Sequence, residues 1–357
     1  ISKRLIRFVD TCVGHKKGGI AIVCVIVACF FGAISGSGPA TVAALGMVLI
    51  PAMIERGGFS APFATALMAT SSSIAIVIPP SIAFVVYASI TGVSIADMFT
   101  AGIVPGILMG LALVIVVMIE ARKNNIQGSM KKASGSERWA AFKDAFWGFL
   151  MPIIILGGIY GGVFTPTESA AIVVLYSLFL DVVVYRELSF KKFIAILKET
   201  VRDSLTIALI IAGATFFGYV ATRAKIPQMI LTSMTSVVSS KVTLLLIINV
   251  FLLIVGCFLE TASAITIVVP LILPLLTAYN INLTQFGIIM VLNLMIGLLT
   301  PPFGLVLFVI SKIGHISIGR FSKALVPWLG ALLAALLLVT FIPQLSLWFP
   351  TMLGMSV

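Results

Sequence analysis

The sequence predicts an all-α polytopic membrane protein made of two inverted repeats, each with a re-entrant helical hairpin and a discontinuous helix. Three observations support this prediction: the composition, the paired polar interruptions of apolar segments, and the placement of the basic residues. With 60% hydrophobic and 10% charged residues, the chain has the composition of a membrane-spanning bundle rather than a soluble domain. The net charge of +11 does not indicate a nucleic-acid partner, because Lys and Arg lie in short loops between apolar segments.

The first hairpin covers residues 18–54. Its apolar run is interrupted near the middle by the sequence ISGSGPAT at 34–41. Each arm would be roughly 22 to 24 Å long as a helix, shorter than the roughly 30 Å of hydrocarbon that a span must cross. Because Lys17 precedes the run and Glu55 follows it, both ends are placed at one membrane surface. Backbone freed from helical bonding at this depth must be buried in protein or line a cavity, which predicts an internal binding surface at the tip.

The rest of the first repeat, which covers 18–120, contains one broken and one continuous span. The segment 60–90 is long enough to span, but Pro79 and Pro80 remove two adjacent backbone donors, so it is predicted to be discontinuous. A clean span follows at 98–119. A basic amphipathic segment at 1–17 precedes the repeat and is expected to lie as an arm at the membrane interface.

The second repeat has the same design. A loop and an amphipathic piece at 121–147 lead into scaffold-type spans and arms at 148–240, and the core of the repeat covers 241–357. This core is predicted to contain a hairpin at 241–277, a span at 284–311 broken near Thr300, and a final span at 324–348. The sequence ISIGRFSKALVP at 316–327 resembles VSIADMFTAGIVP at 93–105, so the two halves are internal repeats offset by about 222 residues.

The basic residues assign the sides of the membrane. With both hairpins re-entrant, one side receives the segments 1–17, 55–59, 120–147, 186–202 and 312–323. These segments hold 20 of the 23 Lys and Arg, and only Arg223, Lys225 and Lys241 fall on the other side. By the positive-inside rule the first side is cytoplasmic, which makes the repeats inverted and places the C-terminal Val357 outside, on the periplasmic side of a bacterial inner membrane.

Inverted repeats, broken helices and a site near the midplane are the architecture of secondary transporters that work by alternating access. Unwound carbonyls and hydroxyls suit Na⁺, and free helix N-termini suit an anion, so two sodium sites are predicted where a hairpin tip meets a broken span. The first comprises Ser35, Gly36, Ser37, Gly38, Ser71, Ser72, Ser73 and Pro79; the second comprises Glu260, Thr261, Ser263, Thr300, Pro301 and Gly304. The candidate substrate ligands are Ser37, Thr41, Ser73, Thr261, Ser263 and Thr300. For any single serine, the alternative is a hydroxyl that bonds back to its own helix.

Two acids lie at informative positions. Glu260, at the second hairpin tip, could hold a cation, accept a proton or cap a helix start. Glu168 ends a TPTE turn at the outer surface, where it is expected to cap the next span. His15 and His315 lie at cytoplasmic edges, and the four cysteines show no metal-ligand spacing. We therefore expect no catalytic residue, no cofactor and no metal other than Na⁺.

At these residues the chain resembles the large membrane subunit of tripartite ATP-independent periplasmic (TRAP) transporters. The resemblance rests on ISGSGPATVAALG at 34–46, IPPS at 78–81, GGVFTPTESAA at 161–171, FLETASA at 258–264 and GLLTPPFG at 297–304. It implies an elevator-type fold of the ion transporter superfamily and Na⁺-coupled uptake of an organic acid, with sialic acid favoured over C4-dicarboxylates. It also implies delivery by a periplasmic binding (P) protein and a small membrane (Q) subunit, separate or fused, in contact with membrane lipid.

Three alternatives were weighed. An intramembrane hydrolase is disfavoured because the chain has no GxSxG or HExxH and neither histidine lies at membrane depth. Hairpin-bearing inverted repeats count against an ATP-driven permease. A self-sufficient Na⁺/dicarboxylate symporter is the closest alternative, and it differs in not needing a binding protein. The second repeat has about 75 residues, 148–222, ahead of the arm that matches 1–17, so we expect roughly 70 further residues before Ile1 in the native product.

Overall fold

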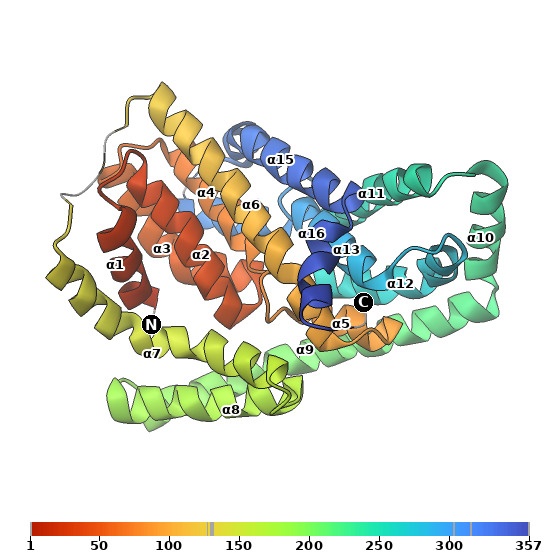
Figure 1. Ribbon diagram of the computed structural model, residues 1–357, viewed down its shortest axis with the longest axis horizontal. Coiled ribbons are helices and arrows are strands. Elements are labelled where there is room, and N and C mark those ends of the chain that lie inside the picture. Colours follow the sequence, from red (N-terminus) through yellow and green to blue (C-terminus); the bar gives the residue numbers. More distant parts are fainter. Residues whose placement is uncertain (1, 127, 129–131, 303, 315, 356–357) are drawn as a thin grey trace.

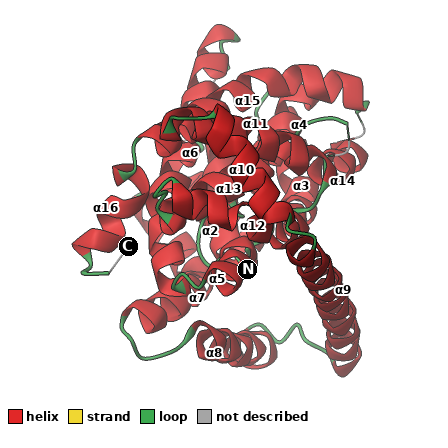
Figure 2. Cartoon of the chain, turned by 90° about the vertical axis from the view of Figure 1, so that its right-hand side faces the viewer, coloured by secondary structure: helices red, strands yellow, loops and turns green. Residues whose placement is uncertain are grey.

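The computed structural model describes residues 2–126, 128, 132–302, 304–314 and 316–355. All regular secondary structure within these ranges is helical, as Figure 2 shows. Eight of the described helices are long and apolar enough to cross a membrane. The predicted all-α polytopic membrane protein is therefore confirmed, whereas the re-entrant placement of the hairpins in a membrane stays a prediction. The expectations for Val357 and His315 fall outside the described residues.

The chain reverses direction at Gly36–Ser37, between α2 (Gly19–Ser35) and α3 (Gly38–Glu55). Gly36 ends α2 in the left-handed region, with φ 62°, which glycine adopts without the steric penalty of a side chain. Ser37 is extended and caps α3 with its side chain, and proline follows in the first helical turn. The two helices have 17 and 18 residues, so each is roughly 26 Å long, less than the hydrocarbon thickness.

The next segment is interrupted where the sequence indicates. Helix α4 (Ala61–Ile74) is capped by Ser60, and α5 (Ile82–Thr91) is capped by Ser81. The stretch between them contains a cis peptide bond at Pro79–Pro80. Helix α6 (Ile95–Lys123) follows, with Ser94 as its N-cap. All residues of α4 from Phe63 to Ile74 are buried, so this broken helix lies in the interior of the repeat.

The second repeat has the same order of elements. Helices α11 (Lys241–Phe258) and α12 (Thr261–Ala278) flank a reversal at Leu259–Glu260. Helix α13 (Leu283–Gly297) is separated from α14 (Leu305–Gly314) by a stretch with a cis bond at Pro301–Pro302. The final segment is divided at Ile342–Pro343 into α15 (Ile318–Phe341) and a short α16 (Gln344–Met352), because proline cannot continue the hydrogen-bond ladder of α15.

The remaining helices connect and flank the two repeats. They are α1 (Ser2–Val13), α7 (Gly135–Tyr160), α8 (Pro166–Phe179) with its π-helical end η1 (Leu180–Val184), α9 (Phe190–Arg223) and α10 (Ile226–Val237). Two boundaries differ from those expected. The amphipathic piece before residue 148 and the span after it form the single helix α7. The arm at 189–199 and the span at 203–222 form the single 34-residue helix α9, because neither Gly nor Pro occurs between Phe190 and Ala212.

The two hairpins point toward each other from opposite ends of the molecule (Figure 1). Helix α3 of the first hairpin packs against α14, and α12 of the second packs against α5. The second half of each broken helix therefore contacts the hairpin of the other repeat. This exchange brings both tips and both breaks into the centre, around α13, in which every residue from Thr284 to Gly297 is buried.

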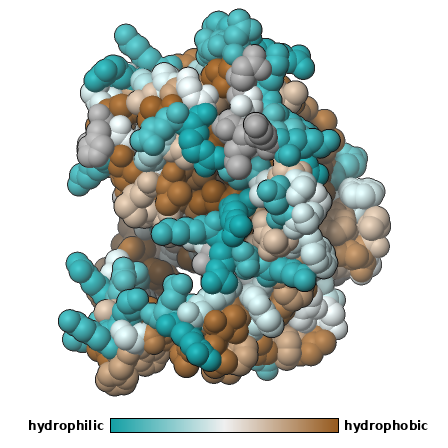
Figure 3. Space-filling view, turned by 90° about the vertical axis from the view of Figure 1, so that its left-hand side faces the viewer, coloured by the Kyte–Doolittle hydropathy of each residue, from teal (hydrophilic) through white to brown (hydrophobic). Residues whose placement is uncertain are grey.

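Helix α1 links the first hairpin to α7. On one side, Asp10 is buried and its Oδ2 accepts a hydrogen bond from Arg56 Nη2 at 2.6 Å, just past the end of α3. On the other side, Arg7 forms an exposed ion pair with Asp144 of α7 at 3.2 Å, and Phe8 packs against Phe149. Hydrophilic side chains gather over this end of the molecule (Figure 3), which also carries the ends of α3 and α6.

Candidate functional site

The first hairpin touches the first break through backbone that has no room for side chains. A Cβ on Gly32 would lie 2.5 Å from Ala75 Cα, just past the end of α4. A Cβ on Gly36, at the tip, would lie 2.9 Å from the carbonyl oxygen of Pro80. Glycine is required at both positions because a Cβ at such distances would displace the neighbouring backbone. The structure thus brings the 35–41 tip and the Ser71–Pro80 break together.

Most hydroxyls at this meeting point bond to nearby carbonyls. Thr41 Oγ1 donates to Ser37 O at 2.8 Å, and Ser35 Oγ donates to the same oxygen at 3.4 Å. Ser72 and Ser73 both donate to Ala69 O, at 2.7 and 3.0 Å. These bonds are the local alternative for serine and threonine in membrane helices. Each O–H group is therefore already donated to a carbonyl of the protein, whereas the lone pairs of the hydroxyl oxygen can still accept a hydrogen bond or bind a cation.

Ser71 differs from its neighbours. Its side chain is fully buried, and Oγ makes no hydrogen bond within the described part of the chain. The Cys24 thiol lies close enough to Ser71 for a weak electrostatic interaction, but the geometry joins that thiol to Met68 Sδ at 3.7 Å and gives Ser71 Oγ no hydrogen bond. A buried hydroxyl without a partner costs about 1 to 3 kcal/mol, a cost that a bound ligand can remove. Ser71 is therefore the strongest ion-ligand candidate in the first site.

The second hairpin meets the second break in the same manner. A Cβ on Gly297 would lie 2.5 Å from Gly256 Cα, so α11 and α13 cross in backbone contact. Gly256 lies one turn before its hairpin tip, as Gly32 does. Gly297 lies one turn before the cis proline pair, as Ala75 does. The two meeting points therefore correspond in position within the two repeats.

Glu260 caps α12. Its Oε2 accepts hydrogen bonds from the backbone N–H groups of Ala262 at 2.8 Å and Ser263 at 3.3 Å, and the residue is exposed. Of the three roles open for this acid, the structure gives it the role of a helix cap, which compensates free N–H groups and the positive end of the helix. Glu168 likewise caps α8 in a reciprocal pair with Thr165, as expected.

Thr261 is the counterpart of Ser71 in the second site. It is 2% exposed, and its Oγ1 has no hydrogen-bond partner in the described structure. Thr300 Oγ1 instead donates to Ile296 O at 2.9 Å, and Pro301 is exposed. A Cβ on Gly304 would lie 2.4 Å from Leu298 O, so the break folds closely back on itself. Within the described residues, neither Glu260 nor Ser263 hydrogen-bonds to Thr300, and the hairpin meets the broken helix one turn earlier, at Gly256 and Gly297.

A buried amide pair was not anticipated from the sequence. Asn293 Nδ2 of α13 donates to Asn249 Oδ1 of α11 at 2.6 Å and to Ile289 O at 2.8 Å. Asn293 Oδ1 is buried without a partner among the described residues. At the repeat offset, Asn293 corresponds to Ser71, so both crossings carry an unsatisfied oxygen one turn before the break. The available signal was the occurrence of asparagine within two otherwise apolar arms.

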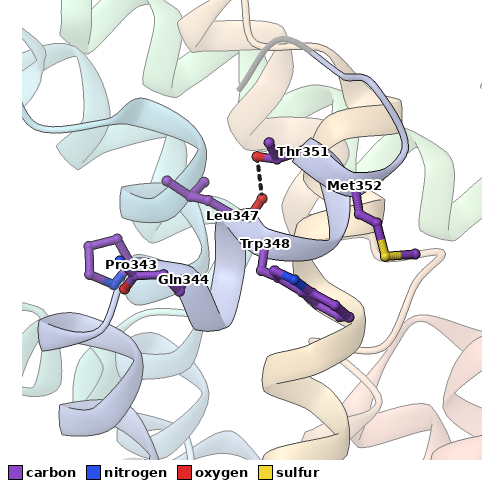
Figure 4. Close-up of a pocket in the computed structure, with 6 residues that line it drawn as sticks. All are labelled: Pro343, Gln344, Leu347, Trp348, Thr351 and Met352. Atoms are coloured by element: carbon purple, nitrogen blue, oxygen red, sulfur yellow. Dashed lines mark hydrogen bonds between the residues drawn. The ribbon is translucent and has the colours of Figure 1, made fainter.

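A cavity of about 470 Å³ lies on α16 rather than at these crossings. Figure 4 shows its lining, which includes Trp348 and Met352, and the bond that Thr351 Oγ1 donates to Leu347 O at 2.7 Å. All of its lining residues come from α16 and the proline before it. We therefore regard it as a surface hollow beside one helix and not as part of the candidate ion sites.

Two hairpins, each packed against a broken helix, define the chain as a polytopic membrane protein of the secondary-transporter class. Comparison with known families agrees. Residues 1–345 match the model of the DctM component of the tripartite ATP-independent periplasmic transporter. The chain belongs to this family, and it is a transporter permease subunit rather than an enzyme.

Several relatives are similar over nearly the whole chain. The C4-dicarboxylate TRAP transporter large permease protein DctM of Pseudomonas aeruginosa is 42% identical over 100% of this chain and 83% of its own length. The sialic acid TRAP transporter large permease protein SiaM of Vibrio cholerae is 37% identical over 98% of this chain and 82% of its own length. The isethionate TRAP transporter permease protein DctMQ of Oleidesulfovibrio alaskensis is 40% identical over 98% of this chain and 55% of its own length.

Proposed function

We propose that this protein is the large membrane subunit of a Na⁺-coupled TRAP transporter that imports an organic acid delivered by a periplasmic binding protein. The observation that carries the Na⁺ coupling is the pair of hairpins that each cross a broken helix, with Gly32 against Ala75 and Gly256 against Gly297. Each candidate site contains a buried hydroxyl without a hydrogen-bond partner in the described structure, on Ser71 of the first broken helix and on Thr261 at the tip of the second hairpin. Hydroxyl and carbonyl oxygens are the ligands that a hard cation prefers.

We place the proposed sodium sites at the positions expected from the sequence, but we assign different roles to the individual residues. Ser71 and Thr261 would supply side-chain oxygens, and the tip around Gly36 and the break around Pro80 would supply backbone carbonyls. Glu260 would act mainly by capping α12. An organic anion would bind between the two tips, where the first turns of α3 and α12 present N–H groups and helix dipoles.

The proposed transport motion is of the elevator type. The hairpins and broken helices form one densely packed body, because each broken helix contacts the hairpin of the other repeat. Helices α8 and α9 are far less buried, with only 11% of each spanning window inside the protein. A body with continuous internal packing can move as a unit against such flanking helices. The exposed Arg7–Asp144 pair joins α1 to the flanking helix α7 and would break at little cost.

The substrate is proposed as an organic acid without further choice between classes. Sialic acid is the substrate that the sequence motifs favour, yet the relatives named for C4-dicarboxylates include the 42% identical protein, and a relative named for isethionate is 40% identical. The substrates in the names of these relatives all carry an anionic group, and the N-terminus of a helix can bind such a group. The isethionate relative is named DctMQ, and this joint name supports the expectation of a small membrane subunit, fused or separate.

The test is uptake into proteoliposomes that contain this protein and its small subunit, with a purified binding protein loaded with sialic acid, a C4-dicarboxylate or isethionate. We expect uptake to require an inward Na⁺ gradient and the binding protein, and to proceed without ATP. Uptake that persists without any binding protein would favour the self-sufficient symporter. Uptake that is indifferent to Na⁺ would overturn the proposed coupling.

A further inference from the structure

A second cavity, about 270 Å³ in volume, opens between α11, α13 and α15 beside the second helix break. Its walls are leucine and isoleucine side chains from these three helices, together with Cys257 and Thr300. We call this cavity the α11–α15 groove. It adjoins the crossing of the second hairpin, because Thr300 belongs to the break and a Cβ on Gly297 would lie 2.9 Å from Cys257 N.

The two polar side chains of the groove direct their donors into the protein. Cys257 Sγ donates to Leu253 O at 3.2 Å, and Thr300 Oγ1 donates to Ile296 O at 2.9 Å. The groove therefore offers no unused side-chain donor to an anion, and its walls lack the two to four polar partners that an ordered water needs. A cavity of about 150 Å³ with similar walls stays dry and takes an apolar guest, so this larger groove suits hydrocarbon.

The corresponding place in the first repeat is closed. There α2 packs against α6, and a Cβ on Gly110 would lie 3.5 Å from Cys29 Sγ. At the repeat offset, Leu332 of α15 corresponds to Gly110, so the second repeat has no glycine at the position where α6 approaches α2. Phe30, the counterpart of Ile254, is 40% exposed and packs against Phe149 of α7, with ring centroids 5.1 Å apart. Ile254 is 55% exposed.

An exposed apolar stripe on α11 leads into the groove. Val250, Ile254 and Phe258 lie one helical turn apart along the same face, and each is more than half exposed. Because α11 is apolar enough to span a membrane, this face meets the hydrocarbon of lipid tails. A lipid chain that follows the stripe would end in the groove with its methylenes against leucine and isoleucine.

We propose that the α11–α15 groove binds one acyl chain of a membrane phospholipid. The bound acyl chain contacts α11, α13 and α15 together, and it therefore stabilises the packing of the second hairpin against the broken helix. A small apolar molecule of similar width would compete for the same groove. The proposal depends only on the cavity and its placement in the membrane, so it stands whether or not the protein couples transport to Na⁺.

The test uses a phosphatidylcholine with a photoreactive diazirine in the middle of one acyl chain, reconstituted with the protein in lipid nanodiscs. We expect saturable adducts on residues 253–257 and 329–333, mapped by peptide mass spectrometry. Cys257→Phe and Leu329→Trp each fill the groove and should lower labelling about tenfold, which equals about 1.4 kcal/mol of binding free energy. Leu337→Trp, at an exposed position on the same helix, is the matched control and should leave labelling unchanged.

Two results would overturn the proposal. Labelling that does not saturate with unlabelled lipid, or that persists in both filled variants, would show only bulk lipid along α11. Rapid reaction of Cys257 with a membrane-impermeant thiol reagent would show that water, not hydrocarbon, fills the groove. If Cys257→Phe does not fold, Leu329→Trp alone decides, because its bulk is added on α15 and leaves the sequence of the hairpin unchanged.

Discussion

Ser71 and Thr261 carry the unpartnered hydroxyls of the two candidate sites, and they give the sharpest test of ion binding. We expect Ser71→Ala and Thr261→Val each to raise the half-saturating Na⁺ concentration about tenfold, which equals about 1.4 kcal/mol for a lost ligand. Thr70→Val and Thr266→Val are matched controls, because these hydroxyls lie outside the candidate sites and donate to Ala66 O and Ala262 O. The measurement is initial uptake against Na⁺ concentration.

The contrary outcome of this test is also informative. Removing a buried hydroxyl that has no partner is neutral or stabilising when nothing binds to it. If Ser71→Ala raises the thermal midpoint and leaves the Na⁺ curve in place, the hydroxyl is an unused buried group. The first sodium site would then have to rest on backbone carbonyls of the tip and the break alone.

Variants of Glu260 can distinguish helix capping from ion binding at this single residue. Because the acid is exposed and caps α12, Glu260→Ala should destabilise the protein by about 1 kcal/mol, a typical cost for losing a cap. Glu260→Gln keeps an acceptor oxygen and should retain most of that stability. We expect both variants to leave the half-saturating Na⁺ concentration nearly unchanged. A large Na⁺ shift in Glu260→Gln, with normal thermal stability, would identify the carboxylate as a ligand.

At the scale of elements, the crossing of α11 and α13 depends on Gly256 and Gly297. Overpacking a close contact typically costs about 1 to 3 kcal/mol, so Gly297→Ala should lower both thermal stability and uptake as the two backbones are forced apart. Gly330→Ala on α15 is the control, because no atom lies within 4 Å of the added Cβ. This control should be neutral or slightly stabilising, since alanine is the better helix former. Equal behaviour of the two variants would contradict the close crossing.

Many elements could be predicted because their signals are local. Pro79–Pro80 and Pro301–Pro302 cannot continue a helix, so both breaks were visible in the sequence. The reversal at Gly36–Ser37 combines a glycine in the left-handed region with a serine cap and a following proline. The single helix α9 was divided in the prediction, because a change from amphipathic to apolar composition was taken as a boundary although no residue there breaks a helix.

The contacts within the candidate sites could not be predicted in the same way. The sequence does not state that Gly256 faces Gly297 or that Asn249 faces Asn293, because these pairs depend on how two distant helices cross. The sequence also does not show whether a serine or threonine hydroxyl donates to a carbonyl of its own helix or remains free to bind a ligand. Ser72 and Ser73 bond to Ala69 O, whereas the adjacent Ser71 points elsewhere on the same helix, and only the packing distinguishes them.

At the scale of the whole molecule, the exchange of contacts between repeats couples the two candidate sites. Helix α14 packs against α3 and α5 packs against α12, so a shift of either hairpin displaces a half-helix that belongs to the other repeat. Two ion sites on such a body would move together rather than separately. This packing is the physical reason for proposing rigid-body motion instead of independent opening of each hairpin.

The inverted arrangement of the repeats predicts on which side of the membrane each loop lies. Most basic residues belong to segments that the threading places in the cytoplasm, including the loop with Lys132, whereas Leu353 follows the last span and belongs outside. In a background without native cysteines, a membrane-impermeant thiol reagent applied to intact cells should label Leu353→Cys and spare Lys132→Cys. Both positions are exposed in the folded protein, so burial does not explain a difference, and permeabilised cells should label both. Labelling of Lys132→Cys alone in intact cells would reverse the orientation and with it the side from which each hairpin enters the membrane.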